Sequence, residues 1–231
     1  MKDARNKELL SGIALLVAFA LWTILIRLID VQNAGPHGTA VGFAALNVWF
    51  HRMTGVNMLI YTITDWLGLV PIIICLGFGL LGLVQLIKRR SLLRVDPDIQ
   101  LLGVYYVLVI LCYLLFEMVP INYRPILIDG NLEASYPSST TLLVLSVMPT
   151  LKYQADRRIA NPVMRKAITA FVFAFSAFMV IERLISGVHW ATDIVGSVFL
   201  STGLYLIYRF MAEYCGQKKM HRHSEASNGI Q

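Results

Sequence analysis

The stretch "KAITAFVFAFSAFMVIERLISGVHWATDIVGSVFLSTGLYLIYRFM", residues 166–211, carries the strongest information about the fold. It contains two apolar runs, 166–181 and 191–211, and a bilayer core about 30 Å thick is crossed by roughly 20 apolar helical residues. Between the runs, "ERLISGVHWATD" places an arginine, a histidine and an aspartate close together. Charged side chains beside membrane-spanning sequence are expected to be functional. The stretch therefore indicates a membrane fold and a candidate site.

The composition of the whole chain is that of an integral membrane protein. Of its 231 residues, 57% are hydrophobic and 15% are charged, and the mean hydropathy is +0.64. These values lie outside the usual balance of a soluble domain. Further apolar runs occupy residues 11–29, 66–87 and 99–119, and a shorter run, 139–152, contains Pro149. The sequence therefore predicts an all-α fold, a six-helix transmembrane bundle.

The distribution of basic residues supports six spans with both termini in the cytoplasm. If each run crosses once, all but four of the 20 Lys and Arg residues fall on the cytoplasmic side, as the positive-inside rule predicts. Omitting the run 139–152 would disturb this sorting. The residues left outside are Arg27, Arg52, Arg124 and Arg183. The net charge of +6 thus reflects membrane topology, and we expect no nucleic-acid partner.

One membrane domain accounts for most of the chain. We expect a six-span domain over residues 1–212 and a polar cytoplasmic tail over residues 213–231. The first run follows a basic amino terminus, but no small-x-small cleavage pattern comes after it, so we expect it to stay in the protein as a span.

The outer loop after the first run, residues 35–65, contains apolar residues at helical spacing. Aromatic residues favour the membrane interface, so the pattern predicts a short helix lying in that interface. The residues that carry this pattern are Trp49, Phe50, Met53, Met58 and Leu59.

Two outer stretches contain the groups expected of a phosphate site. Arg124 in "FEMVPINYRPILIDG" follows the third span, and "EASYPSSTT" opens the fourth span with Pro137, Ser138 and Ser139. Proline followed by hydroxyl residues is typical of a helix amino terminus, where free N–H groups and the helix dipole favour a bound phosphate. The guanidinium groups of Arg124 and Arg183 add charged donors suited to phosphate oxygens.

The segment that joins the last two runs supplies candidate chemistry. His189 and Asp193 are four residues apart, so on a helix they share a face. A carboxylate bonded to one ring nitrogen of a histidine fixes the tautomer and leaves the other nitrogen free to attack. Arg183 would hold the electrophile. The alternative interpretation is that these three side chains only decorate the interface and pair with one another.

These motifs resemble those of a known family. Arg-Pro at Arg124, Pro-Ser at Ser138 and R-x5-H-x3-D from Arg183 to Asp193 are similar to the three signature motifs of the type 2 phosphatidic acid phosphatase superfamily, which also includes vanadium haloperoxidases. The resemblance covers roughly residues 66–212, and the membrane branch of the family has six helices. It implies that His189 takes the phosphoryl group and that Asp193 orients it.

The resemblance also implies a set of phosphate-binding residues and no cofactor. Arg124, Ser138 and Arg183 would hold the phosphate oxygens, together with the helix end at Ser139. No metal ion is implied, because the arginines supply the positive charge. The expected partner is a membrane lipid phosphate within the phospholipid bilayer, and the oligomeric state is not indicated.

Four positions depart from the family pattern K-x6-R-P, P-S-G-H and S-R-x5-H-x3-D. Glu117 replaces lysine, Ser139 replaces glycine, Thr140 replaces the second histidine and Glu182 replaces serine. The missing histidine is the family's general acid, and such an acid contributes about two to four powers of ten in rate. Glu117 also exchanges a positive charge near the phosphate for a negative one.

Three explanations of these departures stay open. Glu182 or Glu117, kept protonated by desolvation, would donate the proton in place of histidine. Alternatively, the substrate is a lipid diphosphate, whose leaving phosphate has a second pKa near 6 and needs little protonation. In the third explanation the protein is catalytically degenerate and binds a phosphorylated lipid or a partner protein.

The sequence as a whole favours a membrane phosphatase. We expect it to hydrolyse a lipid phosphate or diphosphate through a phosphohistidine, at the outer face of the plasma membrane. A small transporter or channel would place charges at mid-span depth, whereas the strong charges here cluster at span ends on one face.

Overall fold

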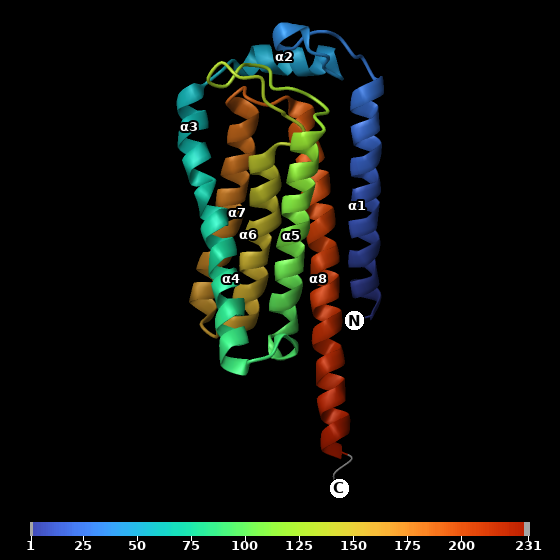
Figure 1. Cartoon of the computed structure of the whole chain (residues 1–231), viewed down its shortest axis with the longest axis vertical. Helices are drawn as coiled ribbons and strands as arrows, with labels where there is room; N and C mark the ends of the chain where they lie inside the picture. The colour runs from blue at the N-terminus through green and yellow to red at the C-terminus, as the bar shows by residue number, and fades with distance from the viewer. Residues whose placement is uncertain (1, 229–231) are drawn as a thin grey trace.

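The helices of this protein form one bundle. The computed structural model describes the backbone of residues 2–228 and the side chains of residues 6–216. Within residues 2–228 there are α-helices, two short 3-10 helices and isolated β-bridges, but no strand. The long helices run side by side, and α2 (Ala44–Thr54) lies across one end of them (Figure 1). We call this the α2 end. The predicted all-α class is confirmed.

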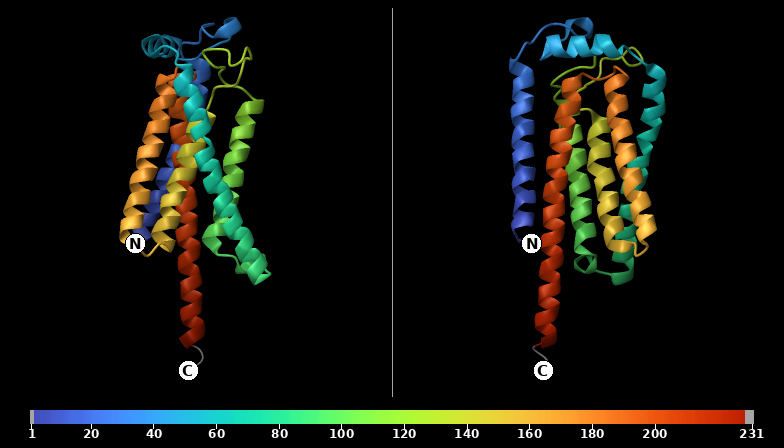
Figure 2. Two further views of the ribbon diagram at one scale, coloured as in Figure 1. Left: turned by 90° about the vertical axis from the view of Figure 1, so that its left-hand side faces the viewer. Right: turned by 180° about the vertical axis from the view of Figure 1, so that it is seen from behind.

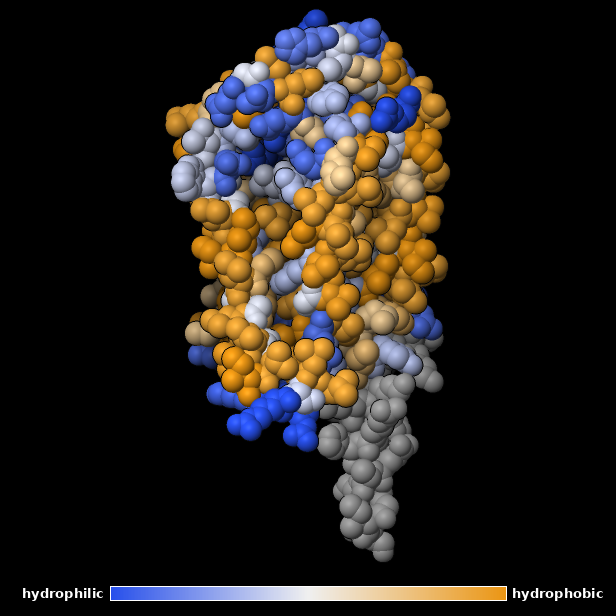
Figure 3. Space-filling view, viewed as in Figure 1, coloured by the Kyte–Doolittle hydropathy of each residue, from blue (hydrophilic) through white to orange (hydrophobic). Residues whose placement is uncertain are grey.

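Five helical segments in the described part of the chain are long and apolar enough to cross a membrane. On the face shown in Figure 3, apolar side chains cover the middle of the bundle, and polar residues gather toward its ends. The segments are α1 (Lys2–Leu28), α3 with α4 (Met58–Leu67 and Leu69–Arg89), α5 (Pro97–Met118), α7 (Pro162–Ile185) and α8 (Ala191–Asn228).

Helix α6 (Ser139–Arg158) is more polar than these five and lies among them. Half of its 20 residues are buried, including Thr141, Ser146 and Thr150. Its polar groups bond to neighbouring helices: the Tyr105 hydroxyl donates to the carbonyl oxygen of Ser146 at 3.0 Å, and the Tyr106 hydroxyl lies 2.7 Å from that of Thr150. Neighbouring helices thus replace lipid around α6. The count of six spans stays a prediction.

The first loop contains more helix than the sequence indicated. We predicted one interfacial helix that includes Met58 and Leu59 and a second span that begins at residue 66. Instead α2 ends at Gly55, whose φ of 65° stops the helix, and α3 begins at Met58. The Asn57 side chain caps α3 by accepting from the N–H of Ile60 at 3.1 Å. Because α3 continues into α4 at Gly68, Met58 and Leu59 belong to the spanning segment.

The first and last helices of the bundle pack closely against each other. Helix α1 lies along α8 (Figure 2), and Gly12 and Gly203 allow this approach, since a Cβ on either would lie about 3 Å from the other helix. Helix α8 continues through residue 212 to Asn228, so no break marks the predicted start of the tail. Residues 229–231 of that tail lie outside the described residues. The 3-10 helices are η1 (Pro36–Gly38) and η2 (Leu92–Arg94).

Candidate active site

His189 lies in the turn between α7 and α8, at the α2 end of the bundle. Its side chain is buried, with 4% of the residue exposed. Nδ1 lies 3.0 Å from the hydroxyl oxygen of Ser135 and 3.1 Å from the Ser135 carbonyl oxygen. Nε2 is also buried but has no hydrogen-bond partner. One ring nitrogen is therefore fixed, and the other is free for a reacting group.

Asp193 stands in the first turn of α8 and is fully buried. Its Oδ2 accepts from the N–H of Trp190 at 3.0 Å, which satisfies a donor at the start of the helix. The same oxygen accepts from the Ser135 hydroxyl, and Oδ1 accepts from the Asn122 amide at 3.2 Å. The distance from Oδ2 to His189 Nδ1 is 3.9 Å. The two predicted partners are thus close, with Ser135 bonded to both.

The environment keeps His189 neutral. Burial lowers the pKa of the imidazole to about 4, and the positive charge of Arg124 adds to this effect. The hydrogen bonding and the negative charge of Asp193 act in the opposite direction without cancelling it. At neutral pH the side chain therefore has an unprotonated ring nitrogen, which a nucleophile requires.

Arg124 and Arg183 approach each other across one aromatic ring. The guanidinium of Arg183 lies 4.9 Å from the ring centre of Tyr61 in α3, and that of Arg124 lies 5.8 Å from it. Both arginines are buried: Arg183 is 1% exposed and Arg124 is 8% exposed. The structure thus brings together two of the predicted phosphate-binding residues, in contact with a tyrosine that no motif indicated.

Each arginine also contacts carboxylates. Arg124 Nε lies 3.0 Å from Glu133 Oε2, although its Nε and Nη1 have no well-aligned hydrogen bond. Arg183 Nη2 lies 3.4 Å from Asp65 Oδ1, and Arg183 Nε lies 3.4 Å from Glu182 Oε2. Glu182, one of the predicted substitute acids, is therefore an ion-pair partner of Arg183.

The start of α6 matches the predicted helix amino terminus. Ser138 is the capping residue, and its hydroxyl accepts from the N–H of Thr141 at 3.5 Å. Its carbonyl oxygen accepts from the Ser197 hydroxyl at 3.0 Å, which ties the start of α6 to α8. Ser138 is fully buried, whereas Ser139 and Thr140 are half-buried. No described contact places Thr140 on His189.

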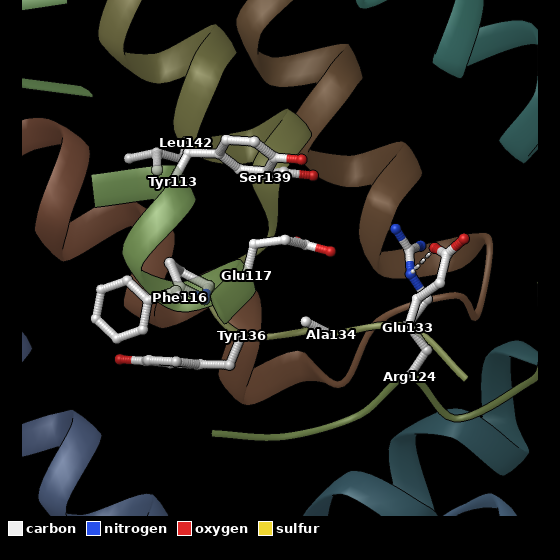
Figure 4. A pocket seen from close by; sticks show the side chains of 10 residues that line it. Tyr113, Phe116, Glu117, Arg124, Glu133, Ala134, Tyr136, Ser139 and Leu142 are labelled. Atoms are coloured by element: carbon white, nitrogen blue, oxygen red, sulfur yellow. Dashed lines mark ion pairs between the residues drawn. The ribbon is translucent and has the colours of Figure 1, made fainter. Parts of the chain in front are cut away.

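A pocket of about 200 Å³ opens beside these residues. Three of the predicted site residues line it: Glu117, Arg124 and Ser139. The other predicted site residues, Ser138, Arg183, His189 and Asp193, are not part of its lining. Figure 4 shows the Glu117 carboxylate pointing across the pocket toward Arg124 and Glu133. A polar hollow is visible near the α2 end of the molecule (Figure 3). The lining is completed by Tyr113, Phe116, Ala134, Tyr136, Pro137 and Leu142.

Helix α2 packs against the residues that directly follow His189. Asn47 is fully buried, and its side-chain Nδ2 donates to the Thr192 hydroxyl at 2.9 Å. Its side-chain oxygen Oδ1 accepts from the Thr192 N–H at 3.3 Å. The ring of His51 lies 5.6 Å from that of Trp190. These contacts hold α2 on the first turn of α8, directly after His189.

Sequence reasoning missed several residues of this arrangement. Ser135, Asn122 and Glu133 belong to the irregular loop between α5 and α6, and Tyr61 and Asp65 belong to α3. Ser135 lies three residues before Ser138 within "EASYPSSTT", so its place beside the predicted helix start was the one available signal.

Comparisons with known proteins agree with the motifs. A family model described as the PAP2 superfamily matches residues 119–215. The fold is similar to the crystal structure of the first transmembrane PAP2 type phosphatidylglycerolphosphate phosphatase from Bacillus subtilis, with a TM-score of 0.61 and 17% identity over 90% of this chain and 96% of that one. A search of curated protein sequences gives no significant match. The part of the chain that matches the PAP2 superfamily model, residues 119–215, includes Arg124, Ser138, Arg183, His189 and Asp193.

Proposed function

We propose that this protein is a membrane phosphatase that hydrolyses a lipid phosphate or lipid diphosphate with His189 as its nucleophile. The observation that carries the proposal is the buried His189 ring, whose Nε2 has no partner while its Nδ1 is held by Ser135. A neutral imidazole fixed at one nitrogen can attack phosphorus with the other. The match of residues 119–215 to the PAP2 superfamily model supports a phosphatase-type enzyme.

The reaction has two steps. In the first, Nε2 attacks the phosphorus atom in line, the bond to the leaving oxygen breaks and a phosphohistidine forms. Arg124 and Arg183 stabilise the charge on the transferred oxygens. Asp193, acting through Ser135, stabilises the positive charge that develops on the ring. In the second step, water attacks phosphorus, the bond between phosphorus and Nε2 breaks, and inorganic phosphate and free His189 are released.

Departure of the leaving group has two routes in this site. In one, Glu117 donates a proton, since it lines the pocket together with Arg124; Glu182, which pairs with Arg183, does not line it. In the other, the substrate is a lipid diphosphate: its terminal phosphoryl group passes to His189, and the lipid monophosphate that leaves needs little protonation. A lipid monophosphate requires the first route, and a diphosphate does not.

The α2 end is proposed to face the outside of the plasma membrane. The basic ends of α4 and α6, with Lys88, Arg89, Arg157 and Arg158, lie at the opposite end of the bundle. Basic residues favour the cytoplasmic side. In this orientation the pocket stands at the outer leaflet, and both termini are cytoplasmic.

A catalytically degenerate, lipid-binding protein is the second candidate. It is favoured by Thr140, which stands at the position of the family's acid, and by the carboxylates that already pair with both arginines. In that case the site would bind a phosphorylated lipid without releasing phosphate.

Phosphate release from a lipid monophosphate and a lipid diphosphate of the same chain tests the proposal. The purified protein in detergent should release phosphate from at least one of them, and His189→Ala should abolish release. His37→Ala is the matched control, because it removes an exposed imidazole from the outer loop and should leave release unchanged. The phosphoenzyme should be labile in acid and stable in base. Binding of both lipids without release would favour the degenerate protein instead.

A further inference from the structure

The pocket beside the candidate active site is unusually acidic for a phosphate site. Glu117 and Glu133 both line it, with Arg124 as the basic side chain of the lining. Glu133 lies 3.0 Å from Arg124, and the Glu117 carboxylate points toward that pair. Two carboxylates therefore face a space where the motifs predict a phosphate.

Arg124 shows that the pocket is nevertheless suited to an anion. It is 8% exposed, and its Nη1 is buried without a hydrogen-bond partner. A buried, unpaired guanidinium donor is costly, so a ligand oxygen is expected there. The same lining includes Ser139 at the start of α6, where a helix end favours negative charge.

The arginines alone do not supply enough positive charge for a phosphate. Arg124 is paired with Glu133, and Arg183 is paired with both Asp65 and Glu182. Glu117 adds a further negative charge. A phosphate dianion that enters this set of groups meets net repulsion, unless a second positive charge enters with it.

The aromatic lining of the pocket indicates the nature of that positive charge. Tyr113, Phe116 and Tyr136 line the same space as the two glutamates. Carboxylates combined with aromatic faces bind organic ammonium groups, through charge-assisted hydrogen bonds and cation–π contacts. A divalent metal ion would require a different donor set. Among the described residues, no group of three or more His, Cys, Asp or Glu side chains is placed to hold one.

We propose that the substrate carries an ammonium group close to its phosphate, and that Glu117 and Glu133 hold the ammonium while Arg124 holds the phosphate. This inference rests on the proposed function and specifies its substrate class: a zwitterionic, amine-bearing lipid diphosphate, because a Glu117 carboxylate that holds an ammonium is not the acid that a monophosphate requires. It also accounts for Glu117, because a glutamate where the family has lysine converts a contact for phosphate into a contact for a cation.

The test uses two substrates that differ in one charge. A long-chain 2-amino-alkyl diphosphate carries an ammonium, and its N-acetyl derivative has the same chain and diphosphate without that charge. Both are diphosphates, so departure of the leaving group does not require Glu117 as an acid. We expect kcat/KM to be about tenfold higher for the amine, as one charge-assisted contact can produce. Glu117→Gln should remove most of this preference, and Glu117→Lys should reverse it. Asp129→Asn is the matched control, because it removes an exposed carboxylate of the loop between α5 and α6 that does not line the pocket.

Binding provides a readout that does not depend on turnover. In the His189→Ala protein, calorimetry should show about tenfold tighter binding of the amine than of its N-acetyl derivative. Glu117→Gln in that background should reduce the difference. Equal binding of both lipids would overturn the inference, whether or not the wild-type protein is an enzyme.

Two activity results would also overturn it while leaving the proposed function intact. One is His189-dependent release at the same rate from both substrates. The other is release from the N-acetyl lipid that requires Mg²⁺ and is lost in Glu117→Gln, which would show that the carboxylates hold a metal ion. An amine preference that persists in EDTA supports the ammonium.

Discussion

The Asp193 carboxylate and the His189 ring lie 3.9 Å apart, and the hydroxyl of Ser135 is bonded to both. Asp193 therefore orients the imidazole through an intermediary. The Ser135 carbonyl oxygen, 3.1 Å from Nδ1, provides a second anchor for the same nitrogen. In this arrangement the carboxylate acts on the ring by polarising a hydroxyl group, and Ser135 is a positioning residue.

Replacing Ser135 with alanine should lower kcat about tenfold while leaving KM nearly unchanged. The ring loses the link to Asp193 but keeps the Ser135 carbonyl oxygen as a partner, so the loss should be smaller than in Asp193→Asn. The measurement is steady-state phosphate release. Ser146→Ala is the control, since that serine is buried in α6 and its hydroxyl has no partner. A change in KM alone would contradict a positioning role.

The rate should depend on pH through His189. Protonation removes the nucleophile, so kcat/KM should fall as pH is lowered through about 4, the pKa that burial and Arg124 impose on the ring. In Arg124→Gln the positive charge is gone and protonation becomes easier. The acidic limb should therefore move to higher pH, toward the ordinary value near 6.5. A limb that already lies near 6.5 in the wild-type protein would contradict this account.

Gly187→Ala should destabilise the α2 end by about 3 kcal/mol. Gly187 has a φ of 69°, and a Cβ there would lie 2.0 Å from the carbonyl oxygen of Gly55. Gly130→Ala separates the two causes, because Gly130 has a φ of 79° but nothing within 4 Å of an added Cβ. It should cost about 1 kcal/mol. Thermal unfolding in detergent measures both, and equal losses would show that the contact with Gly55 is unimportant.

Gly196→Ala should damage both stability and the pocket. An added Cβ would lie 2.4 Å from Cε2 of Tyr136, whose ring lines the pocket. Overpacking of this kind costs about 2 kcal/mol, and KM should rise as the ring moves. Gly103→Ala in α5 meets nothing within 4 Å and should raise the unfolding temperature slightly, because alanine favours helix. If both variants behave alike, Gly196 is not needed for the approach of α8 to Tyr136.

Much of the fold was predictable because its signal is local. Runs of apolar residues of bilayer length identify α1, α4, α5, α7 and α8 without knowledge of their neighbours. The extent of α3 was not predictable, because Gly55 and Asn57 determine it through backbone geometry and capping. Hydropathy also identifies α6 poorly, since its buried positions include polar residues such as Thr141, Ser146 and Thr150.

The site was predictable only where its residues occur in motifs. His189 and Asp193 are four residues apart, with His189 just before the start of α8, so their proximity follows from spacing. Tyr61, which contacts Arg124 and Arg183, is more than 60 residues from either, and no local pattern connects them. Glu133 and Ser135 lie in an irregular loop whose path depends on tertiary contacts.

The polar character of α6 also bears on how the protein is assembled. A segment with Thr141, Ser146 and Thr150 on its buried positions gains little by entering lipid alone. Its partners Tyr105 and Tyr106 are synthesised earlier, in α5, and α7 follows after a connection of three residues, 159–161. We therefore expect α6 to be retained in the bilayer as a hairpin with α7, against an α5 that is already inserted. Nascent chains that end before α7 should leave α6 accessible to membrane-impermeant labels, and chains that include α7 should protect it.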